Sequence, residues 1–342
     1  MLPPDVQEEL APLRHVLGSR MLLSDPPRHT RLRGLVTPAF SAKMAEAKRP
    51  RIRQIADGLL DRVTGRGALD IIADLAVPLP GRAIADLLGV PAEDQERFSR
   101  WSRDQVRVYD RPGTAHERIG IMRRGQAAML ELRAYLEEVI AARRREPRDD
   151  LVSTLVVAEE QGDRLSTDEL VVMIIALLVG GNNSTAHLIG NAALTLLRHP
   201  AALARLRAEP GLIRPAIEEV LRFESPVQAT SRVAREAISL RGETIAPGQG
   251  ISLLFGAANR DPAQFADPDT FDIARQPNRH LTFAHGPHFC LGAALARVEA
   301  QAAVLALVER YDDLAPATGR AEWLPGFSFR GLKSLPVTFR AA

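Results

Sequence analysis

The stretch from Ser166 to Leu197 constrains the fold more than any other part of this chain of 342 residues. It is apolar on nearly every side of a helix and stops at the sequence RHP. Ser166, with Glu169 three residues later, forms a capping-box signature for the start of a helix. Because a helix that is apolar all round has to be buried, we expect this one to run through the middle of the molecule.

The same stretch does not predict a membrane span. Its longest apolar run, LVVMIIALLVGG from Leu170 to Gly181, is shorter than the ~20 residues that cross a bilayer. The N-terminus shows no basic segment followed by an apolar one, so no secretory signal is visible. The single cysteine excludes an internal disulfide framework and fits a reducing compartment. We therefore expect a cytoplasmic protein with no membrane partner.

The charge balance argues against a nucleic-acid partner. Lys and Arg number 44 and Asp and Glu number 42, and the two signs are interspersed along the chain, with a net charge of +2. A nucleic-acid binder usually gathers basic residues in one patch. Hydrophobic residues make up 46% and charged residues 25%, the balance of a soluble globular protein.

The pattern of secondary structure predicts one mainly helical domain over residues 1–342 with a small β region. Residues 26–223 are largely helical in pattern. In the segment that follows, AISLRGETIAPGQGISLLF alternates around a Pro-Gly turn and predicts short antiparallel strands. A further helix is expected after Cys290, with one apolar face formed by Leu291, Leu295, Val298, Ala302 and Leu305.

Cys290 lies in the sequence FAHGPHFCLG and has three interpretations. Free cysteines are usually small buried hydrophobes. With His285 and His288 it could bind zinc, although a further ligand is not obvious. It could also be a thiolate ligand to haem iron, because a loop that ends at the first turn of a helix aims N–H groups and the positive end of the dipole at the sulfur. That environment stabilises a thiolate and moderates its electron donation.

The sequence around Cys290 resembles the signature of the cytochrome P-450 family. That signature is Phe, two spacers, Gly, spacer, His, spacer, Cys, spacer, Gly, and the matching residues are Phe283, Gly286, His288, Cys290 and Gly292. The resemblance implies the cytochrome P-450 fold, with haem b between the long central helix and the helix after the cysteine. It makes Cys290 the axial ligand of the iron. Gly286 and Gly292 would let the macrocycle approach the backbone, and Phe283 would cover the sulfur. Ala284 departs from the family, which usually has glycine there.

The resemblance extends to other charged residues along the chain. It implies that the haem propionates are bound by four residues: His29, Arg33, Arg232 and His288. Taken alone, His29 and Arg33, at i and i+4, would suggest a solvated basic face. Glu219 and Arg222 alone would be a commonplace surface pair. In the family such a pair is buried and fixes the segment before the cysteine. Arg275 and His285 both remain candidates for its third partner.

The middle of the long helix carries the sequence GGNNST at residues 180–185. Two glycines and four polar residues there lower helix stability, each glycine by about 1 kcal/mol. They could mark a helix crossing that needs small residues, or a groove for dioxygen and water, opened because Ser and Thr compete for backbone carbonyls. The resemblance favours the groove, with Gly181 leaving room for oxygen and Asn183, Ser184 and Thr185 forming the polar catalytic group. Asn183 stands where the family usually has an acid, and it cannot release a proton.

The resemblance therefore predicts a monooxygenase acting on a small or medium apolar molecule. We expect Leu177, Gly180, Val227 and Phe327 to line the substrate pocket. The chain shows neither a dinucleotide-binding glycine motif nor a cysteine set for an iron–sulfur cluster, so electrons would come from a separate donor such as ferredoxin with its reductase. Because Asn183 replaces the acid, a peroxide-driven or non-hydroxylating reaction stays open. A catalytically silent haem-binding protein also stays open, as does a shortened chain that lacks the family's N-terminal strands and first helices.

Overall fold

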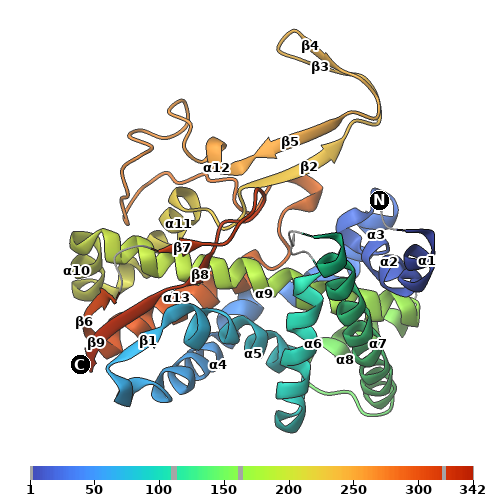
Figure 1. Ribbon diagram of the computed structural model, residues 1–342, viewed down its shortest axis with the longest axis horizontal. Helices are drawn as coiled ribbons and strands as arrows, with labels where there is room; N and C mark the ends of the chain where they lie inside the picture. The colour runs from blue at the N-terminus through green and yellow to red at the C-terminus, as the bar shows by residue number, and fades with distance from the viewer. Residues whose placement is uncertain (1–2, 109–113, 161–164, 318–320, 342) are drawn as a thin grey trace. The chain divides into compact units, whose positions relative to one another are not determined.

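The computed structural model describes residues 3–108, 114–160, 165–317 and 321–341 (Figure 1). The chain divides into two compact units. The first comprises residues 1–59, 77–183 and 291–299, and the second comprises residues 60–76, 184–290 and 300–342. The expectation of one domain over the whole chain stays a prediction.

Helices make up the regular structure of the first unit over its described residues. They are α1 (Pro4–Glu9), α2 (Ala11–Gly18), η1 (Met21–Leu23), α3 (Arg28–Val36), η2 (Thr37–Phe40), α4 (Ala42–Asp61), α5 (Pro78–Leu87), η5 (Ala92–Asp94), α6 (Gln95–Arg107), α7 (Ala115–Arg145), α8 (Leu151–Glu160) and the first parts of α9 (Thr167–Arg198) and α13 (Ala293–Arg310). The start of α7 is fixed by a capping box, in which the Glu117 N–H donates to Thr114 Oγ1 and the Thr114 N–H donates to Glu117 Oε2.

Helix α9 confirms the prediction made for residues 166–197. The Glu169 N–H donates to Ser166 Oγ and the Ser166 N–H donates to a Glu169 carboxylate oxygen, both over 3.1 Å. Its apolar residues are largely buried, among them Leu170, Val171, Ile174 and Leu178 at 0% exposure. Length and apolarity alone would let α9 cross a membrane, but half of its most apolar 18-residue window is buried inside the protein. These are the properties of a core helix.

Over its described residues the second unit combines helices with four small antiparallel sheets. Its helices are η3 (Thr64–Arg66), the π-helix η4 (Ile71–Ala76), α10 (Pro200–Ala208), η6 (Pro210–Leu212), α11 (Ile213–Phe223), α12 (Phe255–Ala258), η7 (Gly286–His288) and the second parts of α9 and α13. Its strands are β1 (Ala68–Asp70), β2 (Ala229–Val233), β3 (Ile238–Leu240), β4 (Glu243–Ile245), β5 (Gly250–Leu254), β6 (Tyr311–Pro316), β7 (Glu322–Trp323), β8 (Leu332–Ser334) and β9 (Pro336–Ala341). The sheets have the orders β1-β9-β6, β2-β5, β3-β4 and β7-β8.

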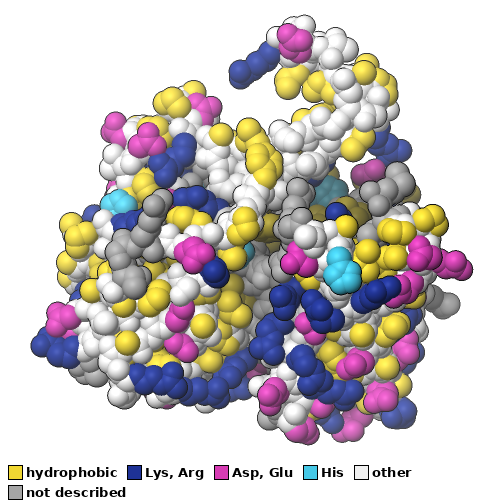
Figure 2. All heavy atoms as spheres, in the orientation of Figure 1, with side chains coloured by type: hydrophobic (Ala, Val, Ile, Leu, Met, Phe, Trp, Pro, Cys, Tyr) yellow, Lys and Arg dark blue, Asp and Glu magenta, His cyan; other side chains and the backbone are white. Residues whose placement is uncertain are grey.

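The strands predicted from the alternating segment are β3, β4 and β5. Strand β3 pairs with β4, and β5 returns to pair with β2. Arg241 and Gly242 both have positive φ values, 51° and 88°, which a two-residue turn twisted to match the strands requires. In Figure 1 the β3–β4 hairpin projects beyond β2 and β5 within this unit. The mixed charge of the sequence also shows in Figure 2, where Lys and Arg lie interspersed with Asp and Glu on the visible face.

Helix α13 follows Cys290 as predicted, but one apolar face describes it too narrowly. Leu295, Val298 and Ala302 are buried. Ala300, Ala303 and Ala306, on the other sides of the helix, are also buried, each at 0% exposure. Alanines on the remaining sides let neighbouring elements approach closely, so the second half of α13 is surrounded rather than half-covered.

Candidate active site

A buried ion cluster lies at the end of α11. Glu219 and Arg222 both have fully buried side chains, and two hydrogen bonds of 2.8 Å join the guanidinium to the carboxylate. The Arg275 Nε–H donates to the same carboxylate over 3.1 Å. The surface interpretation of this pair was therefore wrong, and Arg275, not His285, is its third partner.

The two arginines of this cluster hold the irregular segment before the cysteine. Arg222 donates to the carbonyls of Asn259, Pro268 and Thr270. Arg275 donates to the carbonyls of Ala266, Asp267 and Thr270. A segment without regular structure leaves its carbonyl groups unsatisfied unless side chains bond them. Charged donors do so strongly, which fixes residues 266–275 onto α11.

A second group of hydrogen bonds joins α11 to the start of the cysteine loop. Thr282 Oγ1 donates to the Leu221 carbonyl over 2.6 Å and accepts from Asn259 Nδ2 over 3.0 Å. Asn259 Oδ1 accepts from the Leu281 N–H over 2.7 Å. Asn259 and Thr282 are both buried. Phe283, the first residue of the predicted signature, is thereby fixed in place.

The cysteine loop closes on itself. The Cys290 N–H donates to the Phe283 carbonyl, and the Phe289 N–H donates to the Gly286 carbonyl, both over 2.9 Å. Gly286 has φ +75° and Ala284 has φ +60°. The left-handed conformation at residue 284 explains why glycine would suit that position, because an L-residue with a Cβ is strained there by roughly 1–2 kcal/mol.

Cys290 is exposed, so the interpretation as a small buried hydrophobe was wrong. The zinc interpretation finds no support, since the described residues contain no group of three or more His, Cys, Asp or Glu that could hold a metal ion. Helix α13 begins at Ala293, and Cys290 and the half-buried Gly292 lie just before it. In the chain, Cys290 therefore directly precedes the end of this helix that carries the positive partial charge.

Of the predicted propionate partners, two lie in the first unit and two in the second. His29 and Arg33 are on α3, where His29 is only 2% exposed, so a solvated basic face does not describe it. Burial and the Arg33 charge lower the pKa of His29. In the second unit, His288 lies in η7 and is half-buried, and Arg232 lies exposed on β2.

The middle of α9 opens onto free space. Gly180 and Gly181 are exposed, and a Cβ added at either would meet nothing within 4 Å. The crossing-helix interpretation is therefore wrong for these glycines. The helix is unbroken through residues 180–185, so the space comes from missing side chains. Leu177, Asn183 and Ser184 are half-buried beside it, whereas Thr185 is buried at 3% exposure.

Asn182 was not predicted to have a role of its own. Its Nδ2 donates to Ser102 Oγ on α6, within the first unit. Its side chain also lies against Gly81, where an added Cβ would be 3.4 Å from Asn182 Oδ1. Asn182 therefore ties α9 to its neighbours. Of these two asparagines, Asn183 is the one that can serve the open space beside Gly180 and Gly181.

In the second unit, two segments predicted to line the pocket run side by side. Residues 226–228 pair with residues 328–330: the Gln228 N–H donates to the Ser328 carbonyl over 2.8 Å, the Arg330 N–H donates to the Pro226 carbonyl over 3.0 Å, and Val227 bridges Phe329. Val227 is half-buried and Phe327 is 66% exposed. The sequence did not single out Asn191 of α9, whose Nδ2 donates to the carbonyls of Glu224 and Arg330 and so ties both segments to the helix.

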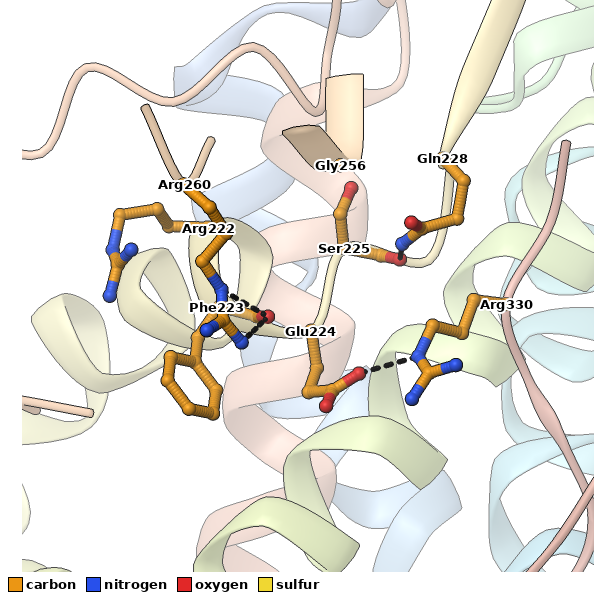
Figure 3. A pocket seen from close by; sticks show the side chains of 8 residues that line it. All are labelled: Arg222, Phe223, Glu224, Ser225, Gln228, Gly256, Arg260 and Arg330. Carbon is orange, nitrogen blue, oxygen red and sulfur yellow. Dashed lines mark hydrogen bonds and ion pairs between the residues drawn. The ribbon is translucent and has the colours of Figure 1, made fainter. Parts of the chain in front are cut away.

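A cavity of about 220 Å³ lies beside these segments (Figure 3). Its lining consists of Arg222, Phe223, Glu224, Ser225, Gln228, Gly256, Arg260 and Arg330. Arg330 donates to Glu224 over 2.7 Å, and Arg260 donates to the Phe223 carbonyl over 2.8 Å. The cavity includes none of the residues predicted to line the substrate pocket. Arg260 and Arg330 hold the two residues just before Ser225.

The sequence profile of the cytochrome P-450 family matches residues 103–320. The chain belongs to the cytochrome P-450 family. It is 47% identical over 324 residues to cytochrome P-450 107B1 of Saccharopolyspora erythraea, which covers 94% of this chain and 77% of that protein. It is 41% identical over 336 residues to the biotin biosynthesis cytochrome P-450 of Bacillus subtilis strain 168, covering 98% of this chain and 84% of that protein.

A solved structure gives the same result. The crystal structure of P-450 BioI, in complex with acyl carrier protein ligated to hexadec-9Z-enoic acid, has a TM-score of 0.89 and 41% identity to this chain, and the match covers 99% of this chain and 86% of that one. The mainly helical fold with small sheets is thus the cytochrome P-450 fold. The enzyme is a cytochrome P-450 monooxygenase, an oxidoreductase whose family implies a haem cofactor.

Each unit, taken by itself, has residues of the kinds that bind a haem group. The second unit offers one exposed thiol, on a loop whose turn needs positive φ values. The first unit offers open space over Gly180 and Gly181 and a basic pair on α3 with a buried imidazole. Thiolate for the iron and cationic or N–H donors for the carboxylates are the ligand types that such a group needs.

Proposed function

We propose that this protein binds haem b through Cys290 and inserts one oxygen atom of O2 into a small or medium apolar organic molecule. The overall reaction consumes the substrate C–H, O2, two electrons and two protons, and it yields the alcohol and one water. The electrons come from a separate donor of the ferredoxin type. The one exposed thiol carries the proposal, because Asn259 and Thr282 fix the start of its loop onto α11.

The chain's own residues divide the work. When bound, the haem supplies the site at which dioxygen is reduced. Cys290 would ligate the iron, and Phe283 and Gly286 shape the loop around the sulfur. His29, Arg33, Arg232 and His288 would bind the two propionates, since half-buried carboxylates need charge-assisted partners. The same proposal places the enzyme in the cytoplasm, because α9, the one helix of the described residues long and apolar enough to cross a membrane, has half of its most apolar stretch buried inside the protein.

Proton delivery is the step in which this chain departs from its family. Ser184 can hold a water molecule as donor and acceptor, but the Asn183 amide cannot release a proton. Protons would therefore reach the open side of α9 through water that Ser184 and Asn183 orient. The same amide favours a second candidate, an oxidation driven by peroxide, which already carries two protons and two electrons. Asn183→Asp distinguishes the two candidates. The amount of product formed per electron consumed rises if water replaces the missing acid, and it stays flat or falls if peroxide is used.

The carbon monoxide difference spectrum of the reduced, haem-loaded protein tests the thiolate. We expect a strongly red-shifted Soret band in the wild type, and its loss in Cys290→Ser. Cys290→His is the companion variant: haem retained with the band of a histidine-ligated haem shows that the fold is intact and that the sulfur alone was lost. A wild-type band already at the histidine position contradicts the proposal.

A further inference from the structure

His187 stands apart from the other residues of α9 by its surroundings. It lies one turn after Ser184 and one turn before Asn191, on the same side of the helix. Its ring lies 6.4 Å from the ring of Phe329, centroid to centroid. A Cβ added at Gly331 would come within 1.9 Å of His187 Nδ1. Only glycine at residue 331 therefore leaves room for this imidazole.

The wall beside His187 is apolar and firmly held. We use the name phenylalanine wall for Val227, Phe327 and Phe329. The paired segments 226–228 and 328–330 carry it, and Asn191 ties Glu224, two residues before the first segment, and Arg330 of the second to α9 through two hydrogen bonds of 3.0 Å. Phe327 is 66% exposed and Phe329 is 47% exposed. Large aromatic side chains exposed in a group on a rigid backbone usually mark a binding surface.

The imidazole is a polar group at the edge of this apolar wall. Among the described residues, no hydrogen bond ties its ring nitrogens. Burial alone lowers the pKa of His187 to about 4, so the ring is neutral at pH 7. A neutral imidazole offers one N–H donor and one acceptor nitrogen. It can therefore pair with an uncharged oxygen, as a donor to a keto oxygen or as donor or acceptor with a hydroxyl.

We propose that His187 is a specificity-determining residue that hydrogen-bonds a hydroxyl or keto oxygen of the substrate, while Phe327 and Phe329 pack against the adjoining hydrocarbon. The inference rests on the proposed function, because it takes the phenylalanine wall to face the substrate. It narrows the substrate class to apolar molecules that carry a neutral oxygen. A plain hydrocarbon leaves the imidazole unpaired, and a site built for a polar atom discriminates against an analogue that lacks it.

Binding of three matched probes tests this assignment: cyclododecanol, cyclododecanone and cyclododecane, measured by equilibrium dialysis with the haem-loaded enzyme. They share one ring and differ in the oxygen. We expect the wild type to bind the alcohol and the ketone about tenfold more tightly than the hydrocarbon. His187→Phe keeps an aromatic ring but removes both nitrogens, and should reduce that ratio to below about twofold by weakening the oxygenated probes. His187→Gln keeps a donor and an acceptor and should retain several-fold discrimination.

His199→Phe is the matched control. His199 also lies in the second unit among aromatic rings, but its Nδ1 is bonded to the Thr195 carbonyl, and it packs on Phe223 and Phe271 rather than on the phenylalanine wall. Its ratio should equal that of the wild type. A wild type without preference for the oxygenated probes, or a His187→Phe variant that keeps the wild-type ratio, overturns the inference.

The failure of the inference and that of the proposed function are distinguishable. The probe ratio is a binding measurement and needs neither electrons nor turnover. The carbon monoxide spectrum, recorded on each variant, reports the thiolate separately. A normal spectrum with an unchanged ratio removes His187 from substrate recognition and leaves the enzyme as proposed. The expected ratios with no thiolate band keep the recognition role and remove the proposed reaction.

Discussion

Glu219 on α11 and Glu299 on α13 are both buried, at 0% and 3% exposure, yet they differ in the donors around them. Five donors reach the Glu219 carboxylate, from Arg222 twice, Arg275, Asn278 and the Asp272 N–H. Among the described residues no such set surrounds Glu299, and burial raises its pKa to about 8. Burial by itself therefore does not decide whether a carboxyl group is a charge or a neutral acid. The donors that the fold brings to it decide.

Glu219→Gln should have the largest effect on stability. The change leaves Arg222, whose side chain is fully buried, without its counter-charge and turns an amide N–H₂ toward its donors. Removing one partner of a buried pair costs about 3–5 kcal/mol. We expect that loss in urea unfolding at pH 7, together with a weaker hold on residues 266–275 and less haem bound per chain.

The neighbouring residue offers a matched control for this change. Glu218 is 27% exposed and pairs with His280 over 3.1 Å. Glu218→Gln should cost no more than about 1 kcal/mol, the usual range for partly exposed pairs. Equal losses in the two variants would mean that the arginines around Glu219 find other partners, and the contrast drawn from burial would not hold.

Glu299→Gln should change the pH dependence of stability more than its value. The folded state keeps Glu299 protonated up to about pH 8, whereas the unfolded chain releases that proton near pH 4.5. The contribution of protonated Glu299 to the free energy of unfolding is thus fully present below pH 4.5. It falls as pH rises toward 8, by up to about 1.4 kcal/mol per pH unit. Glu299→Gln removes that slope and should be the more stable protein at pH 8. Urea unfolding at half-unit steps of pH measures it.

His187 makes the free energy of unfolding depend on pH with the opposite sign, over a pH range that overlaps that of Glu299. Its folded pKa of about 4 lies below the ordinary 6.5, so its contribution is present above pH 6.5 and is lost as pH falls toward 4. Between about pH 4.5 and 6.5 the effects of His187 and Glu299 on stability oppose each other. Above pH 6.5, of these two groups only Glu299 still lowers stability as pH rises. The Glu299→Gln protein should therefore gain stability from pH 4 to 6.5 and then level off. A wild type and a variant with parallel profiles would show that Glu299 is not held neutral.

The parts of the site that the sequence predicted are those set by short spacings. The capping box at Ser166, the loop from Phe283 to Cys290 and the pair Glu219–Arg222 each involve residues within a few positions of one another. The third partner of Glu219 could not be chosen from the sequence, because Arg275 reaches it only after the irregular segment folds back onto α11.

Residues whose roles depend on distant neighbours gave no signal in the sequence. His187 and Asn191 occupy ordinary positions of an apolar helix, and their contacts come from Glu224 and from residues 329–331, which are distant in the chain. Glu299 falls between Val298 and Ala300 on a helix expected to expose one side. The sequence could not show that residues 298–304 of α13 are buried on every side, because that depends on which elements pack on its alanines.

Asp168→Asn should have the smallest effect on stability of the variants discussed. It extends the comparison of buried carboxyl groups to one that is partly exposed to solvent. Asp168, at the start of α9, is 38% exposed and pairs with His15 over 3.0 Å and with Arg133 over 2.7 Å. These partners, His15 foremost, lower the pKa of Asp168, so its stabilising contribution is present above pH 3.8 and is lost as pH falls through the lower folded pKa. Water screens such a pair to about 0.2–1 kcal/mol, and added salt screens it further. We expect Asp168→Asn to lose at most that amount in low salt and almost nothing in 1 M NaCl, whereas the loss in Glu219→Gln persists in salt. If the Asp168→Asn loss matched that of Glu219→Gln and ignored salt, exposure would not be what separates the strong ion cluster from the weak one.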